Sequence, residues 1–185
     1  MASIPSRSFT DPTGQEFLIR TPRGEDAAAM LAYIGPVAGE TEFFIVEPDE
    51  FPAEDEERKW IQDHLDHPGK LLLLAEASGT IIGSLSFENG RYRRIAHRGS
   101  FGIGVRKEWR GRGVGTALLR TLLEWAEANP IIEKVGLEVF ATNERAIRLY
   151  KKLGFVEQGF GGKEVKRGPG EYVDVVWMYR FVKQV

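Results

Sequence analysis

The chain contains no cysteine, which excludes disulfide bonds, thiolate-bound metals and a catalytic cysteine. Histidine is scarce as well, with three among 185 residues. His64 and His67 stand three positions apart, a spacing that could hold a metal on a helix, but Pro68 and Gly69 follow at once and predict that the helix ends there. We therefore expect a solvated helix end at this place and no metal site.

The sequence also lacks a strong net charge and a long apolar run. The formal net charge is -2, which gives no general attraction to nucleic acid or to an anionic membrane. No stretch approaches the ~18 apolar residues of a membrane span, and the first residues do not resemble a secretory signal. These features predict a cytoplasmic protein without a membrane partner. The basic stretch RYRRIAHR at residues 91–98 follows an Asn-Gly turn, so we expect it to lie at a hairpin end rather than to bind nucleic acid.

The composition is that of a globular protein, with 42% hydrophobic and 28% charged residues. Residues 1–15 are rich in Ser, Pro, Thr and Gly and are expected to form a flexible lead-in, followed by one domain over residues 16–185. Antiparallel strands are predicted first, and one strand-helix-strand-helix passage follows them. The predicted fold class is therefore α/β, built around a mixed sheet.

Apolar periodicity and turn signals predict the order of the elements. Strands are expected at 16–22, at 70–90 as a hairpin, and at 99–105, 134–140, 155–160 and 172–181. Helices are expected at 25–38 with a break at Gly35-Pro36, at 52–65, at 113–129 and at 142–154. The acidic run 47–57 suits the start of the second helix, where the macrodipole favours negative charge, and it could also attract a cationic amine.

The most distinctive stretch is VRKEWRGRGVGTALLRTLLEWA, in which Gly111, Gly113 and Gly115 open a leucine-rich helix. The first amides of a helix have no intrahelical partners and carry partial positive charge, and glycine lets a phosphate approach them closely. Basic side chains surround the loop: Arg106, Lys107, Arg110 and Arg112. The loop lacks the lysine of the Walker pattern and the spacing of the dinucleotide fingerprint. It therefore predicts a pyrophosphate site of another class.

The pattern Arg-x-x-Gly-x-Gly, from Arg110 to Gly115, resembles the pyrophosphate loop of the GNAT superfamily of acyl-CoA-dependent N-acyltransferases. Downstream, LEVFATNERAIRLYKKLGF at residues 137–155 is similar to the second signature of that family: an Asn on a strand-helix turn, a Tyr seven residues later, and Leu-Gly-Phe. The resemblance covers about residues 17–181. It implies the GNAT fold, a single mixed, mostly antiparallel twisted sheet flanked by helices, with acetyl-CoA as co-substrate and no metal.

The same resemblance implies the residues of the site. Contacts with acetyl-CoA are expected from Ile103, Gly104, Val105, Arg110, Gly111, Arg112, Gly113, Val114, Gly115, Thr116, Asn143, Ala146 and Tyr150. Tyr150 is expected to protonate the departing sulfur, since a phenol with a pKa near ~10 holds its proton at neutral pH. A helix cap at Asn143 and an ordinary half-buried aromatic at Tyr150 are the alternatives.

Glu138 interrupts the apolar strand VGLEVF, where a carboxylate that faced a dry core would be costly. Either its face is solvated or the side chain has a function. The sequence Leu-Glu-Val ahead of Asn143 is similar to the branch of the family that includes ribosomal-protein alanine acetyltransferases, which implies that Glu138 is the base that deprotonates the amine. The alternatives are Glu88, at the end of the neighbouring hairpin, and a water with no dedicated side chain.

The implied activity is acetyl transfer to a primary amine of a small molecule, peptide or protein, by direct attack in a ternary complex. The alternative is a non-catalytic acyl-CoA-binding sensor. The segments expected to shape the acceptor side, residues 35–44 and 164–176, carry no motif specific to an antibiotic, a polyamine or a peptide. A homodimer is a reasonable expectation for such a domain.

Overall fold

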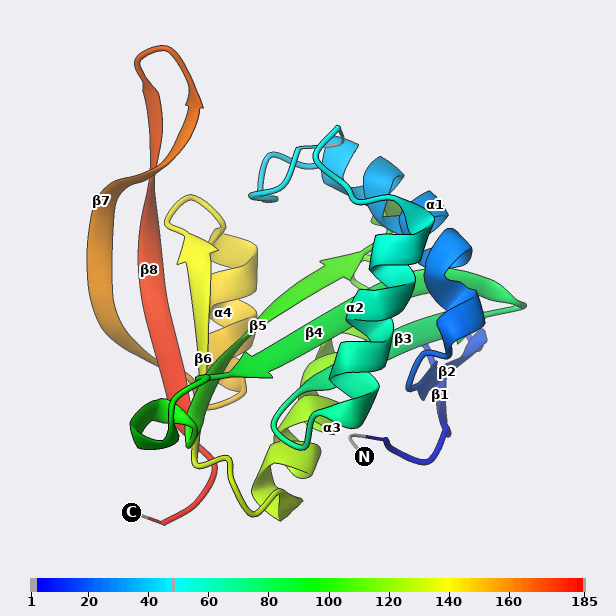
Figure 1. The fold of residues 1–185 in the computed structure, drawn as a ribbon. Coiled ribbons are helices and arrows are strands. Elements are labelled where there is room, and N and C mark those ends of the chain that lie inside the picture. The colour runs from blue at the N-terminus through cyan, green and yellow to red at the C-terminus, as the bar shows by residue number, and fades with distance from the viewer. Residues whose placement is uncertain (1–2, 48, 185) are drawn as a thin grey trace.

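The computed structural model describes residues 3–47 and 49–184, which form one eight-stranded sheet with helices on both faces (Figure 1). The strand order is β1-β2-β3-β4-β5-β6-β8-β7, and every neighbouring pair is antiparallel except β5 with β6. The strands are β1 Arg7–Thr10, β2 Glu16–Arg20, β3 Leu71–Ala77, β4 Thr80–Asn89, β5 Arg98–Val105, β6 Lys134–Phe140, β7 Val156–Gly168 and β8 Glu171–Phe181. The helices are α1 Ala27–Gly39, α2 Glu54–Asp66, α3 Val114–Ala128 and α4 Glu144–Lys152, with short 3-10 helices at Gly24–Asp26, Arg93–Ile95 and Lys107–Trp109. The predicted mixed, mostly antiparallel sheet is confirmed.

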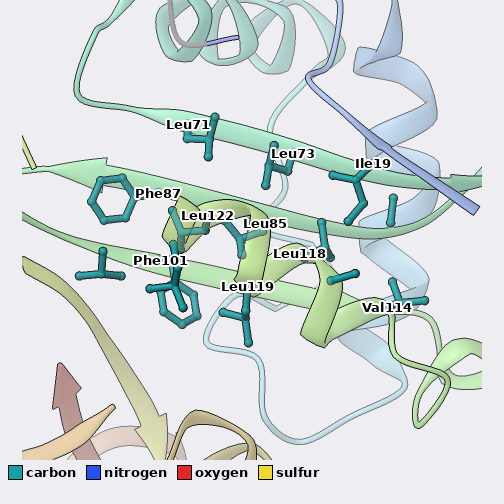
Figure 2. Packing of buried hydrophobic residues seen from close by; sticks show 14 of the residues in the cluster. Ile19, Leu71, Leu73, Leu85, Phe87, Phe101, Val114, Leu118, Leu119 and Leu122 are labelled. Carbon is teal, nitrogen blue, oxygen red and sulfur yellow. The ribbon is translucent and has the colours of Figure 1, made fainter. Parts of the chain in front are cut away.

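One face of the sheet carries the larger hydrophobic core, under α3 (Figure 2). Val114, Leu118 and Leu122 of α3 are completely buried, because they recur at helical spacing on the face that meets the sheet. Their partners on β4 include Leu85 and Phe87, which are also completely buried. Each such side chain contributes about 1.5–3 kcal/mol relative to exposure, so α3 and the glycine loop before it are firmly anchored.

The opposite face of β3 and β4 is covered by α1 and α2 (Figure 1). Tyr33 and Val37 of α1 and Ile61 of α2 are buried in this second cluster. The predicted break at Gly35-Pro36 is wrong, since α1 runs on to Gly39 with Pro36 inside it. Burial of the residues on either side of Pro36 stabilises the helix despite the missing backbone donor.

The N-terminal segment differs from the flexible lead-in expected over residues 1–15. Residues 1 and 2 lie outside the described part of the chain, but Arg7–Thr10 forms β1, paired with β2 from Arg7↔Ile19 to Thr10↔Glu16. Phe9 stacks on Phe17 with 5.5 Å between the ring centroids. The strand forms because its partner is close in sequence and supplies this aromatic contact.

The last hairpin is longer than its apolar pattern predicts. A strand is expected at 155–160, whereas β7 continues to Gly168, where it pairs with Glu171 of β8. The extension is mostly exposed and polar, so it leaves no apolar alternation in the sequence. In Figure 1 this hairpin projects beyond the neighbouring strand β6.

Candidate active site

The glycine loop lies between β5 and α3 with the backbone that its sequence predicts. Gly111 and Gly113 have φ values of 84° and 92°, in the left-handed region that favours glycine. Gly113 is the N-cap of α3 and has no side chain to satisfy the first amides of the helix; the first backbone bond runs from the Ala117 amide to the Gly113 carbonyl. The amides before Ala117 are therefore free to face an anion.

The loop also lies directly over β5. A Cβ atom on Gly115 would be 3.9 Å from side-chain atoms of both Ile103 and Val105. On the other face of the same strand, a Cβ atom on Gly104 would be 3.0 Å from the Phe44 ring and 3.1 Å from the Tyr33 hydroxyl oxygen. Close packing on both faces explains the small residues of this strand.

The arginines of the loop hold its shape. The Arg112 guanidinium donates to Asp11 at 2.5 Å and to Gln15 at 2.7 Å, and it stacks over Trp109 at 4.0 Å. Arg110 donates to the Val105 carbonyl at 2.9 Å, and its guanidinium lies 3.1 Å from Glu40. Both arginines, which were expected to add positive charge around the loop, are therefore engaged by acidic partners distant in sequence.

Asp11 is the carboxylate that holds the Arg112 side chain of the glycine loop in place. Burial would raise its pKa, but hydrogen bonds from Thr13, the Gln15 amide and Arg112 outweigh burial and lower the pKa of Asp11 to about 2. Asp11 is therefore ionised at neutral pH and pairs with Arg112. No motif in the sequence points to Asp11, which stands in the segment expected to be flexible.

β5 and β6 separate after a short parallel ladder. Their pairs are Arg98↔Lys134, Gly99↔Val135 and Ser100↔Gly136, and the two strands then diverge (Figure 1). On its other side β5 stays paired with β4 as far as Val105. Among the described strands, none pairs with the β6 side of β5 beyond Ser100. The backbone from Phe101 to Val105 is therefore available on this side to a ligand that enters the gap.

α4 brings Asn143 and Tyr150 to one side of this gap. The Asn143 side chain accepts a hydrogen bond from the Ala146 amide at 3.2 Å, so the helix-cap alternative describes its role within the protein. Tyr150 is buried, with ring centroids 5.7 Å from Phe101 and 6.0 Å from Phe155. Burial raises the pKa of Tyr150 to about 12, so the phenol is protonated at neutral pH.

Glu138 lies on the other face of the sheet. Its neighbours Leu137 and Val139 point into the core, whereas the Glu138 side chain is exposed and accepts a hydrogen bond from Trp177 Nε1 at 2.9 Å. The Glu138 side of β6 is therefore exposed to solvent, which is one of the two alternatives given for this carboxylate. Trp177 was not singled out in the sequence, and its position opposite Glu138 follows from the β6–β8 register.

Glu138 borders a pocket of about 400 Å³ on that face. Its lining includes both carboxylates considered as bases and two basic residues: Glu88, Glu138, Arg98 and Lys134. Smaller residues, including Ser100 and Gly136, complete the floor between them. The pocket therefore combines acidic and basic groups beside the separation of β5 and β6.

His64 is completely buried, which corrects the expectation of a solvated helix end. Its Nδ1 lies 2.9 Å from the Trp60 carbonyl oxygen, and its Nε2 lies 3.3 Å from the carboxylate of Glu88. Burial lowers the pKa of His64, although the Trp60 carbonyl and Glu88 favour the charged ring; Lys70 and Asp63 act on it as well, in opposite directions. Within residues 3–47 and 49–184 no group of three or more potential metal ligands occurs.

The segments expected to shape the acceptor side, 35–44 and 164–176, contribute no residue to the lining of the pocket beside Glu138. The segments 35–44 and 164–176 come together, since Arg167 forms an ion pair with Glu42 at 2.7 Å. The basic stretch 91–98 connects β4 to β5 and includes the 3-10 helix Arg93–Ile95. None of the helices in the described part of the chain is long and apolar enough to cross a membrane.

Comparison with known proteins adds independent information. The sequence model of the Acetyltransferase (GNAT) family matches residues 38–155. The L-amino acid N-acetyltransferase AaaT of Escherichia coli K12 is 37% identical over 121 residues, which cover 65% of this chain and 74% of that protein.

Solved structures agree in fold. An acetyltransferase of the GNAT family from Streptococcus pneumoniae superimposes with a TM-score of 0.86 at 28% identity, over 90% of this chain and 99% of the other. The structure of yncA from Salmonella typhimurium with its cofactor acetyl-CoA has a TM-score of 0.81 at 21% identity, over 91% and 95% of the two chains. At that identity the second likeness concerns the fold alone.

Proposed function

Because the chain belongs to the acetyltransferase (GNAT) family, and is thus an acetyl-CoA-dependent N-acetyltransferase, we propose that it transfers acetyl directly to a primary amine bound beside acetyl-CoA in a ternary complex. The observation that carries this proposal is the separation of β5 and β6 after Ser100 and Gly136. It leaves an unpaired strand edge next to free helix amides, an arrangement that suits a long ligand with a pyrophosphate at one end.

The two proposed catalytic side chains lie on opposite faces of the sheet. Tyr150 packs in the core under α3, whereas Glu138 faces the pocket on the other side. In the proposed complex, coenzyme A lies on the Tyr150 side and the amine approaches from the Glu138 side. The gap between β5 and β6 is where the two substrates meet.

In the proposed reaction, Glu138 takes a proton from the acceptor ammonium, and the resulting free amine attacks the thioester carbonyl carbon. The new C–N bond forms, the C–S bond breaks, and the departing sulfur takes a proton from Tyr150. The nitrogen loses its second proton to solvent as the amide forms, and Tyr150 regains its proton from solvent. A phenol whose pKa lies near 12 holds that proton until a strong base forms next to it. Exposure of Glu138 to the pocket supports the role of base, since the carboxylate can reach the incoming amine.

Release of coenzyme A tests the proposal directly. The chain has no cysteine, so a thiol reagent added to the reaction detects coenzyme A without background from the protein. We expect amine-dependent thiol release and initial-velocity lines that intersect, as a ternary complex requires. Tight acetyl-CoA binding with no release for any amine would instead identify the sensor alternative, and a stable acetyl-protein adduct by mass spectrometry would contradict direct transfer.

The acceptor and the assembly are finer parts of the same proposal. AaaT acts, by its name, on L-amino acids, and this favours a small acceptor here too.

We also propose a homodimer, because Val156, Phe160 and Tyr172 of the terminal hairpin are large and exposed, at 51%, 63% and 47%. Light scattering of the wild type and of Phe160→Asp tests the dimer. The cytoplasmic location and the absence of nucleic-acid and membrane partners stay predictions.

A further inference from the structure

The pocket beside Glu138 has its two basic residues at one end and Glu138 at the other, with Glu88 between them, opposite Ser100. Arg98 and Lys134 form the first pair of the β5–β6 ladder, Ser100 and Gly136 form the last, and Glu138 follows where the strands separate. Side chains alternate along a strand, so Lys134, Gly136 and Glu138 share one face. Lys134 and Glu138 are four positions apart along the strand, which places their Cα atoms ~13 Å apart.

The acidic side chains of the pocket are not equivalent. The Glu88 carboxylate lies 3.3 Å from Nε2 of the buried His64 and 3.4 Å from Lys70 Nζ, a cation that it shares with Asp63, which lies at 2.5 Å, so Glu88 already has a cationic partner within the protein. Glu138 accepts a hydrogen bond from Trp177 and has no cationic partner among the described residues. Glu138 is therefore the carboxylate that is free to meet an ammonium group.

The two basic side chains of the pocket, Arg98 and Lys134, are also available to bind an anionic group. No carboxylate of the described residues lies within ion-pair distance of the Arg98 guanidinium, and Arg98 is exposed at the rim. Lys134 donates to Gln158 at 2.9 Å and lies 4.1 Å above the Tyr179 ring, which positions its ammonium without neutralising it. Arg98 and Lys134 thus bring two positive charges to the pocket that no carboxylate of the described residues compensates.

Resting on the proposed function, we propose that the acceptor carries a carboxylate as well as its amine, and that Arg98 and Lys134 bind this carboxylate while the amine faces Glu138. The acceptor class is an amino acid. A pocket of about 400 Å³ is in the range of small-molecule sites, and its floor of Ser100 and Gly136 leaves room for the body of such a ligand. A polyamine would place a second ammonium against Arg98 and Lys134, so like charges would repel it.

The test compares matched acceptors that differ only in the carboxylate: leucine, leucinamide and isopentylamine, and in parallel phenylalanine, phenylalaninamide and phenethylamine. Coenzyme A release is measured for each with the wild type, Arg98→Gln and Lys134→Gln. We expect either substitution to lower kcat/KM for the amino acids by about tenfold or more, since each removes a charge-assisted hydrogen bond, and to leave the simple amines unchanged. Comparing variants cancels the different amine pKa values of the acceptors.

Arg94→Gln is the matched control. Arg94 is also exposed and lies four residues from Arg98, in the 3-10 helix Arg93–Ile95, but it does not line the pocket. We expect this variant to behave as the wild type with every acceptor. A loss of equal size in Arg94→Gln would show a general effect of surface charge and would overturn the assignment of Arg98.

A binding experiment separates this inference from the proposed function. The complex with coenzyme A is titrated with N-acetylleucine and with N-acetylleucinamide, which requires no turnover. Preferential binding of the acid, lost in Arg98→Gln and Lys134→Gln, supports the inference even when no amine releases coenzyme A and the proposed function fails. Equal binding of acid and amide, or equal use of amino acids and simple amines, overturns the inference while the proposed function stands.

Discussion

Replacing Gly113 by alanine tests the anion site at the start of α3. Gly113 has a φ of 92°, and a Cβ atom built on it meets no atom within 4 Å. Within the protein the substitution therefore costs backbone strain alone, about 1–2 kcal/mol for an L-residue in the left-handed region. Under the proposed function the open space in front of Gly113 holds the pyrophosphate, so the methyl group also obstructs the ligand.

Gly170 provides a matched control. It has a φ of 81°, its Cβ position is equally open, and it lies in the distant β7–β8 turn. Gly113→Ala and Gly170→Ala are expected to lose similar unfolding free energy in urea. Loss of one hydrogen bond to a charged phosphate is worth about 1.5–3 kcal/mol, which predicts that Gly113→Ala alone weakens acetyl-CoA binding by about 10- to 150-fold.

Isothermal titration calorimetry with acetyl-CoA measures the difference. Wild-type affinity in a folded Gly113→Ala protein would refute the assignment of the pyrophosphate to this loop. Equal loss of affinity in both variants would refute it too, because strain rather than the position of the methyl group would then explain the result.

Three further outcomes are expected. Tyr150→Phe keeps the ring contacts with Phe101 and Phe155 and should lower kcat by ~10²-fold or more at unchanged acetyl-CoA affinity, so steady-state kinetics that show full turnover would remove Tyr150 from the chemistry. Glu138→Gln should slow transfer at neutral pH and recover part of the rate at high pH, where solvent deprotonates the amine; parallel pH profiles of kcat/KM would reject the base. Burial lowers the pKa of His64 below its ordinary 6.5, so just below pH 6.5 the unfolded chain binds a proton that the folded chain does not. The free energy of unfolding should therefore fall as the pH drops below 6.5. Urea unfolding at several pH values checks this, and an identical pH dependence in His64→Asn would contradict it.

Features set by neighbouring residues were predictable from sequence. The left-handed glycines before α3, the acidic first turn of α2 and the apolar hairpin of β3 and β4 each depend on a short stretch of chain. The same holds for the Asn143 cap, whose partner is three residues away. Such local rules were sufficient to predict the position of the loop and the order of the helices and strands from β2 onward, but not β1 or the short 3-10 helices.

Features that depend on tertiary partners were not predictable in this way. The charge of Arg112 is engaged by Asp11, which is 101 residues away in sequence, and the burial of His64 depends on the sheet that folds against it. Pro36 remains helical because packing outweighs its local preference. The electrostatics of the pocket likewise follow from charged side chains on β4, β5 and β6, whose contacts a single sequence does not specify.

The ion pair between Asp11 and Arg112 has a consequence for synthesis of the chain on the ribosome. Thr13 and Gln15 already donate hydrogen bonds to one oxygen of Asp11, and these bonds need only the first residues of the chain. At about 5–20 residues per second, the 101 residues that separate Arg112 from Asp11 take about 5–20 s to emerge. The bonds that orient the carboxylate therefore need no residue beyond Gln15, whereas its ion pair needs the chain as far as Arg112.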